Sequence, residues 1–240
     1  MGFSIEIYLI QAMHGLVYGM LLFLVASGLT LVFCFFFVLN LAHASFYMLG
    51  AYFAYTVTLY SGSFWLSLLI YPIVVGVLGI LIERFLIRKA YKGGHLSQLL
   101  LTFGLFFIIG ELVRIIWGSS PLSVAPPKIL AGDIPFAGMT YPIYRLFIFG
   151  FSFLVLLGMA LLLMRTRIGI IIRAAVSDPG MVEALGNNVP IVFMGVFGGG
   201  SALSALAGVI AAPFLSTHLG MGAEVLLDCF VVIVVGGFGS

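Results

Sequence analysis

The stretch FWLSLLIYPIVVGVLGILI, residues 64–82, contains no charged side chain, and it decides the class of fold. A helix rises about 1.5 Å per residue, so a run of this length matches the roughly 30 Å hydrocarbon core of a lipid bilayer. The basic residues Arg84, Arg88, Lys89 and Lys92 follow directly. An apolar run that ends in a basic cluster indicates a transmembrane helix with its C-terminal end in the cytoplasm.

The rest of the chain has the same apolar character. Of the 240 residues, 8% are charged and 63% are hydrophobic, whereas an ordinary soluble domain has about 25% charged residues. So few charges cannot cover the surface of a soluble protein. The composition therefore excludes a soluble enzyme, a nucleic-acid-binding protein and a disulfide-stapled secreted domain. We predict an all-α, polytopic transmembrane helical bundle in the lipid bilayer, with residues 1–240 forming a single transmembrane domain.

Further apolar runs predict about six to seven spans. The run 7–39 is longer than one span needs, so it is tilted, over-long or broken, and the run 44–60 follows it. Three more runs cover residues 96–117, 144–164 and 191–215. The last run, from residue 229 to about 235, is too short to cross a bilayer. It is either re-entrant or the start of a longer segment, and we expect a chain truncated at its C-terminus.

The basic residues predict the orientation of these spans. Seven of the ten Lys and Arg residues lie in two loops, at about 83–95 and 165–190, an even number of spans apart. The positive-inside rule therefore places both loops in the cytoplasm and makes the loops at about 118–142 and 216–228 external. The N-terminus is then external as well, provided that both early runs cross fully.

The sequence contains none of the motifs of ATP hydrolysis or catalysis that we sought. A P-loop, H-E-x-x-H and G-x-S-x-G are all absent, so the chain does not hydrolyse ATP itself. Its four histidines show no metal-ligand spacing. Glu111 is the one acidic residue well inside a run, whereas ion-driven transporters usually carry more buried carboxylates. We expect no enzyme activity, no catalytic residues, no metal site and no cofactor.

The second basic loop contains the signals of a short helix. Asp178 suits its N-cap, Pro179 its first position and Gly186 the residue after its end. A helix of about seven residues is marginal in water and needs a surface to pack against. It is either a coupling helix that inserts into a partner protein or an ordinary loop helix at the membrane interface.

A polar interruption at residues 40–43 separates the first two apolar runs. Asn40 and His43 are costly in hydrocarbon unless their hydrogen bonds are satisfied. The segment is either a break inside the membrane that lines a pathway or an interfacial loop anchored by Phe46, Tyr47 and Tyr52.

Two other patterns permit two interpretations each. Small residues recur at helix-contact spacing in Gly15/Gly19, Gly195/Gly199 and Ser204/Gly208, and they favour packing within the chain over a dimer interface. Glu111 and Arg114 lie three residues apart, which favours a structural ion pair over a role in a pathway.

Taken together, these residues resemble the permease subunits of bacterial branched-chain amino-acid ABC importers, over nearly the whole chain. The order and spacing of the motifs carry the resemblance, and no single motif is decisive. Ala44 and Asn187 depart from the residues that are common at their positions. The matching motifs are GLVYGM (15–20), SGLTLVF (27–33), NLAH (40–43), YMLGAY (47–52), LLLTFG (99–104), Glu111 with Arg114, RTRIG (165–169), Asp178-Pro179, Leu185-Gly186, AGV (207–209) and GGFGS (236–240).

The resemblance implies a multi-pass subunit of an ATP-driven importer in the bacterial inner membrane. Its implied partners are a second, homologous permease subunit, two cytoplasmic ABC ATPase subunits and an extracytoplasmic solute-binding protein. The substrate would be a branched-chain or related amino acid, and the alternative is a stand-alone secondary transporter or channel for a small solute. The implied ATPase-coupling residues are Arg173, Ala174, Ala175, Asp178, Pro179, Glu183, Ala184 and Gly186. The candidate pathway residues are Asn40, His43, Thr102 and Glu111.

Overall fold

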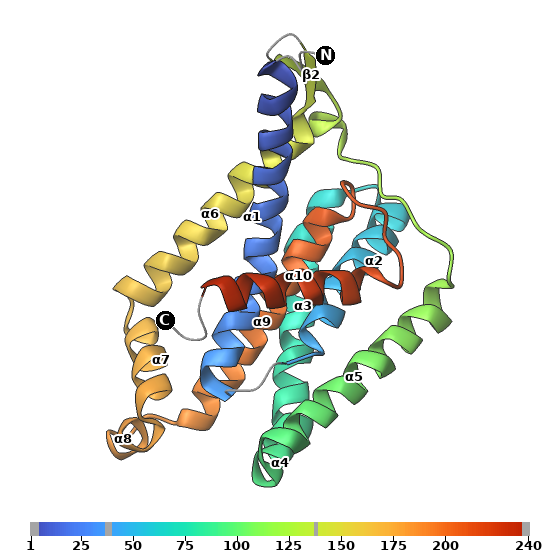
Figure 1. Ribbon diagram of the computed structural model, residues 1–240. Helices are drawn as coiled ribbons and strands as arrows, with labels where there is room; N and C mark the ends of the chain where they lie inside the picture. Colours follow the sequence, from blue (N-terminus) through green and yellow to red (C-terminus); the bar gives the residue numbers. More distant parts are fainter. Residues whose placement is uncertain (1–4, 37–39, 137–138, 237–240) are drawn as a thin grey trace.

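The computed structural model describes residues 5–36, 40–136 and 139–236, and the chain in these ranges is almost entirely helical (Figure 1). The long helices are α1 (Ile5–Phe36), α2 (His43–Ser61), α3 (Phe64–Ile82), α5 (Gly94–Trp117), α6 (Ile143–Arg165), α9 (Val189–Ala211) and α10 (Met221–Gly236). The short helices are α4 (Arg88–Ala90), α7 (Arg167–Ser177) and α8 (Pro179–Ala184), with a π-helix, η1 (Glu83–Ile87), and two 3-10 turns, η2 (Tyr91–Gly93) and η3 (Lys128–Leu130). The prediction of a helical bundle is confirmed.

Within the described ranges, five helices are long and apolar enough to cross a membrane: α1, α3, α5, α6 and α9. The predicted span 64–82 coincides with α3, and α5, α6 and α9 begin and end within a few residues of their predicted runs. The run 44–60 forms α2, which is absent from the five because Tyr, Ser and Thr side chains dilute its apolar character. The last run belongs to α10, whose 16 residues are fewer than the roughly 20 that a span needs.

Two loop predictions need correction. The predicted loop 216–228 ends early, because α10 begins at Met221 and includes Glu224 and Asp228, four residues apart along one helix. The proline-rich loop 118–142 contains a small antiparallel hairpin of β1 (Asp133–Phe136) and β2 (Met139–Pro142), in which Ile134 pairs with Tyr141. Acidic residues such as Glu224 and Asp228 are typical of loops, and so are the prolines of the loop 118–142. The sequence pattern therefore did not predict the start of α10 or the β-hairpin.

The first apolar run forms one continuous helix over its described part, because α1 extends unbroken to Phe36. Residues 37–39, the end of the predicted run, lie outside the described ranges, as do residues 237–240 of the C-terminal motif. The chain then turns back at residues 40–42, and α2 begins at mid-height of the bundle, beside α3 and α9 (Figure 1). Asn40 and His43 are buried there, so the polar segment lies inside the bundle and is not a loop on its surface.

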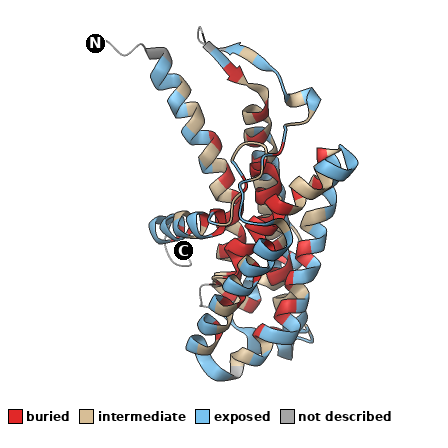
Figure 2. Ribbon diagram, turned by 90° about the vertical axis from the view of Figure 1, so that its right-hand side faces the viewer, coloured by how far each residue is buried: buried red, intermediate tan, exposed pale blue. Residues whose placement is uncertain are grey.

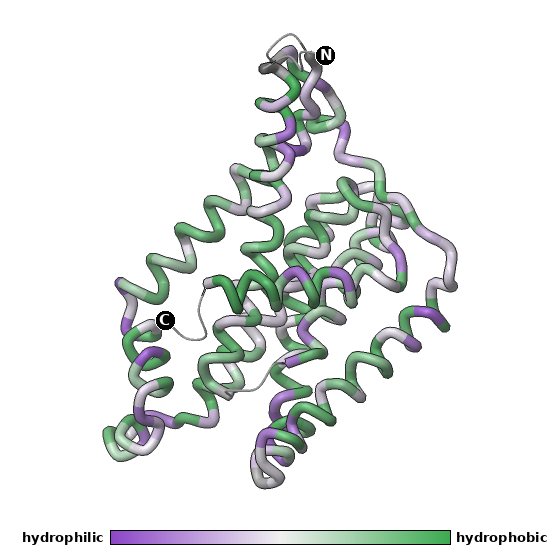
Figure 3. The backbone as a smooth tube through the Cα atoms, viewed as in Figure 1, coloured by the Kyte–Doolittle hydropathy of each residue, from purple (hydrophilic) through white to green (hydrophobic). Residues whose placement is uncertain are grey.

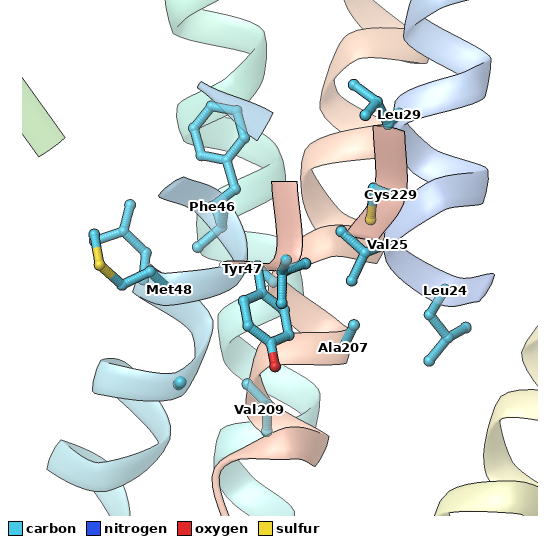
Figure 4. Close-up of a cluster of buried hydrophobic side chains, with 14 of the residues drawn as sticks. Leu24, Val25, Leu29, Phe46, Tyr47, Met48, Ala207, Val209 and Cys229 are labelled. Carbon is cyan, nitrogen blue, oxygen red and sulfur yellow. The ribbon is translucent and has the colours of Figure 1, made fainter. Parts of the chain in front are cut away.

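Helix α9 forms the centre of the bundle, where it packs against α1, α2 and α3, and the buried residues gather around it (Figure 2). Small residues allow the close approach: a Cβ at Gly208 would collide with the carbonyl oxygen of Tyr47, and one at Gly28 would lie 2.7 Å from the Gly200 oxygen. Packing by Ser204 and Gly208 is therefore confirmed, whereas a Cβ at Gly15, Gly19, Gly195 or Gly199 would meet no atom within 4 Å. Figure 4 shows part of this core, with Tyr47 of α2, Ala207 and Val209 of α9, Val25 and Leu29 of α1, and Cys229 of α10.

The two basic loops lie at the same end of the bundle, where Figure 1 shows α4 and α8, and the β-hairpin lies at the opposite end. Hydrophilic residues gather toward both ends of the long helices, which are apolar along their middle parts (Figure 3). Helix α10 lies across the bundle and packs against α1 and α2. The predicted orientation requires both basic loops to lie at one end of the bundle, and they do; which side of the membrane that end faces stays a prediction.

Candidate functional site

The predicted coupling loop folds into two short helices, α7 and α8, after a sharp corner at the end of α6. Thr166 caps α7, and its hydroxyl oxygen accepts a hydrogen bond from the Gly169 N–H at 3.1 Å. Only glycine fits at position 169, because a Cβ there would collide with the carbonyl oxygens of Leu162 and Leu163. Helix α7 corrects the prediction of a loop between residue 165 and Asp178. The basic residues suggested a loop, although Ile168, Ile171 and Ile172 recur at helical spacing.

Helix α8 has the caps that the sequence predicts. The Asp178 Oδ1 accepts a hydrogen bond from the Met181 N–H at 3.0 Å, and Pro179 occupies the first turn. At the other end, Gly186 adopts a φ of 86° and donates to the Glu183 carbonyl at 2.9 Å. The Asn187 N–H donates to the Val182 carbonyl at 3.2 Å, which completes a Schellman motif. Both ends of this six-residue helix are therefore fixed.

The two faces of α8 differ. Val182 is buried and attaches the helix to the bundle, while Met181 and Leu185 are 60% and 74% exposed. Residues three or four apart lie on the same side of a helix, so Met181, Ala184 and Leu185 form one exposed face, which we call the docking face. Of the eight predicted coupling residues, all but Ala175 are exposed. The prediction omitted Met181 and Leu185, although two apolar residues four apart in a short polar loop are a usable signal.

Removing the N-cap of α8 should loosen this helix alone. Asp178→Ala deletes the acceptor for the Met181 N–H, a change that costs about 1 kcal/mol at a typical N-cap. We expect faster hydrogen exchange of the backbone amides of residues 180–185, measured by mass spectrometry, with no change in the melting temperature of the bundle. Asp178→Asn is the matched control, because asparagine caps as well as aspartate does. Equal exchange in the two variants would show that the cap does not hold α8.

The buried polar segment forms a second candidate site. The His43 Nε2 donates to the Val25 carbonyl of α1 at 3.1 Å, and the Ser204 hydroxyl of α9 donates to the His43 carbonyl at 2.9 Å. Within the described part of the chain, the His43 Nδ1 and both side-chain polar atoms of Asn40 have no hydrogen-bond partner. Buried polar atoms are nearly always paired, so these unpaired atoms mark an unusual polar position inside the bundle.

The other two predicted pathway residues lie on α5 and have partners on the same helix. Thr102 is buried, and its hydroxyl donates to the Leu99 carbonyl at 3.1 Å. Glu111 accepts two hydrogen bonds from Arg114, at 2.6 and 3.1 Å, and both side chains are more than half exposed. The ion pair predicted from their spacing is therefore present. The structure brings Asn40 and His43 together and leaves Glu111 on an exposed face.

The contact between α1 and α10 has no counterpart in the sequence pattern. The Tyr18 hydroxyl of α1 donates to the Asp228 carboxylate of α10 at 2.6 Å. The pattern places Asp228 in a loop, and nothing in the local sequence pairs it with a residue 210 positions away. Among the described residues, no three His, Cys, Asp or Glu side chains are close enough to hold a metal ion.

Known proteins share the sequence features of this bundle. Residues 11–240 match the family model described as branched-chain amino acid transport system, permease component. The chain is similar to the high-affinity branched-chain amino acid transport system permease protein BraD of Pseudomonas aeruginosa, with 29% identity over 97% of this chain and 80% of the relative. Escherichia coli LivH, with the same description, shares 27% identity over the same fractions of the two chains.

A more distant organism provides a third relative. The probable branched-chain amino acid transport permease protein LivH of Methanocaldococcus jannaschii is 28% identical over 92% of this chain and 72% of its own length. No solved structure matches the chain at a significant level. The family match covers nearly the whole sequence and agrees with the helical bundle and its five potential spans. The chain therefore belongs to the branched-chain amino acid transport system permease family, and it is a multi-pass membrane permease, not an enzyme.

Proposed function

We propose that the chain is the membrane subunit of an ATP-driven importer for branched-chain or related amino acids in the bacterial inner membrane. The observation that carries this proposal is α8, a capped helix with an exposed apolar docking face at the end of the bundle that holds both basic loops. Adjoining exposed apolar side chains commonly mark an interaction site, and Met181 and Leu185 adjoin on one face of α8.

The partners follow from this assignment. Two ABC ATPase subunits bind α8 from the cytoplasm, a second homologous permease completes the pathway, and an extracytoplasmic solute-binding protein delivers the amino acid. The loops 83–95 and 165–190 are then cytoplasmic, and the loops 118–142 and 216–220 are external. The names of the relatives, each a branched-chain amino acid permease, support this choice of substrate class.

Transport proceeds by alternating access. ATP binding closes the ATPases, which displaces α8, and the displacement reaches the long helices through α7 and α9 on either side of it. His43 lies where α1, α2 and α9 meet, and Asn40 precedes it by three residues. In this proposal their unpaired polar atoms interact with a passing amino acid. Thr102, buried on α5, is a further candidate for the pathway, whereas the pairing of Glu111 with Arg114 supports a structural role.

Reconstitution tests the proposal directly. The chain, its partner permease, the two ATPases and the binding protein are placed in liposomes, and uptake of radiolabelled leucine, isoleucine and valine is measured with and without ATP. We expect uptake only when ATP and the ATPases are present. Uptake by the chain alone would contradict the proposal and would favour a stand-alone secondary transporter or channel. The control is the same assembly with a non-hydrolysable ATP analogue, which should support no sustained uptake.

A further inference from the structure

We propose that Arg88 is a positioning residue that ties the two basic loops together, so that displacement of α8 reaches α3. The proposal rests on the proposed function in one respect, since it assumes that α8 receives the force from the ATPases. It concerns the Glu83 cluster, by which we mean the side chains of Glu83, Arg88 and Tyr91 and the carbonyl group of Pro190.

Glu83 is the centre of this cluster. Its side chain is completely buried at the end of α3. It accepts hydrogen bonds from the Arg88 Nη2 at 3.1 Å, the Arg88 Nε at 3.4 Å and the Tyr91 hydroxyl at 2.8 Å. Burial and the hydrogen bond to Glu83 raise the pKa of Tyr91, so its hydroxyl remains protonated and continues to donate. A buried carboxylate with three such donors holds the loop 83–95 in one conformation.

A π-helical turn produces this geometry. On an α-helix, side chains five residues apart point in different directions. The helix η1 is a π-helix, in which the bond spans five residues: the Arg88 N–H donates to the Glu83 carbonyl. The wider turn brings the side chain of Arg88 back over Glu83. Single π-helical turns within α-helices are rare and occur frequently at functional sites.

Arg88 makes one further contact, and this contact reaches the coupling loop. Its Nη2 also donates to the carbonyl oxygen of Pro190 at 3.0 Å, across 102 residues of sequence. Pro190 lies in the first turn of α9, directly after the Schellman motif that ends α8. The guanidinium group therefore joins the end of α3 to the residue where the coupling loop enters the bundle.

Aromatic side chains enclose this junction. The ring of Tyr91 contacts Phe193 of α9 edge-on, with centroids 6.4 Å apart, and Phe193 contacts Phe35 of α1 at 5.2 Å. The end of α1, the start of α9 and the loop after α3 thus meet around one partly buried cluster, in which Glu83 is buried and Arg88 is partly exposed. The hydrogen bonds to Glu83 are partly shielded from water, and shielding strengthens a hydrogen bond, whereas the bond from Arg88 to Pro190 lies at the exposed edge of the cluster. Because these bonds share one guanidinium group, the three segments are expected to move as one body.

The simpler explanation, that the cluster only stabilises the fold, makes a different prediction. A buried ion pair is a weak source of stability, and its replacement by uncharged residues of similar volume is often neutral. The double variant Glu83→Gln with Arg88→Met removes both charges and leaves neither one unpaired. If the cluster serves stability alone, this variant should transport normally.

We expect the double variant to assemble with the ATPases and to hydrolyse ATP, but to move at least tenfold less amino acid per ATP than the unmodified chain. Hydrogen exchange at the backbone amides of residues 187–189, 191 and 192 should also increase, because the Pro190 carbonyl loses its contact with Arg88. Lys89→Met is the matched control. Lys89 is exposed and adjacent in sequence, so this change removes a positive charge without touching Glu83. It should leave both readouts unchanged.

Arg88→Lys gives a second, independent test. An ammonium group retains the charge opposite Glu83 but cannot reproduce the planar fork that spans Glu83 and Pro190. We expect normal assembly and an amount of amino acid transported per ATP hydrolysed that lies between those of the unmodified chain and the double variant. If the double variant does not assemble, this variant alone tests the role of Arg88.

A ratio of amino acid to ATP equal to that of the unmodified chain, in either assembled variant, would overturn the role of Arg88. It would leave the binding of α8 to the ATPases untouched. If the ATPases did not bind α8 of the unmodified chain, the proposed function would be refuted instead.

Discussion

Gly208→Ala is expected to separate α2 from α9 and to destabilise the whole bundle. The added Cβ would collide with the Tyr47 carbonyl oxygen and lie 3.1 Å from the Ala51 backbone nitrogen. Both obstacles are backbone atoms of a buried helix, so neither can rotate away as a flexible side chain could. Overpacking of this kind typically costs about 1–3 kcal/mol, and Gly208→Val should cost more.

The measurement is the melting temperature of the purified protein in detergent, together with its yield in the membrane. Gly199→Ala is the matched control on the same helix, since a Cβ there meets no atom within 4 Å. Alanine favours a helix over glycine by about 1 kcal/mol, so this control should be as stable as the unmodified chain or more stable. Equal melting temperatures for the two variants would mean that α2 and α9 do not approach as closely as described.

The second large effect is expected from substitutions on the docking face of α8, and it concerns binding of the ATPase subunits. The double variant Met181→Glu with Leu185→Glu places two carboxylates on the docking face and should abolish stable binding of the ATPase subunits. Both side chains are more than half exposed, so the bundle itself should keep its melting temperature. A few central apolar residues commonly carry most of the energy of an interface. We therefore expect the dissociation constant for the ATPases to increase at least tenfold, measured by co-purification from detergent.

Charge reversal beside the docking face offers a graded version of this experiment. Asp178→Arg and Glu183→Arg alter exposed carboxylates next to it and should weaken ATPase binding and uptake without unfolding the long helices. The matched control for the double glutamate variant is Leu59→Glu with Tyr60→Glu, which introduces the same two negative charges on exposed residues at the far end of α2. If every α8 variant binds the ATPases as tightly as this control does, α8 is not the coupling helix.

Features encoded by neighbouring residues were predictable. The uncharged run 64–82 became α3 with the predicted bounds, because transmembrane length and the basic residues that follow it are local properties. The caps of α8 were equally predictable, since Asp178 and Gly186 each form a hydrogen bond with a backbone group three residues away, and Pro179 lies in the first turn. The sequence also identified Asn40 and His43 as costly polar residues in an apolar region, and both are buried.

Features that depend on distant partners were not predictable. Arg88 and Tyr18 each bind a group more than 100 positions away, at Pro190 and Asp228, and no periodicity in the sequence records such a contact. Glu224 and Asp228 suggested a loop because acidic residues are expensive in hydrocarbon. In the folded chain α10 lies across the bundle, and Asp228 receives the Tyr18 hydroxyl, so the acidic residue can remain in a helix.

The connections of α8 to α7 and α9 are short, and they constrain the length of the segment 166–189 as well as its composition. Asp178 alone separates α7 from α8, and only residues 185–188 separate α8 from α9. Each added helical residue rotates the next part of the chain by about 100°. Insertion or deletion of a single residue between α7 and α9 would therefore turn Met181 and Leu185 away from any partner, or turn α9 away from the bundle. We therefore expect the loop 118–142 to tolerate insertions and deletions better than the segment between α7 and α9 does.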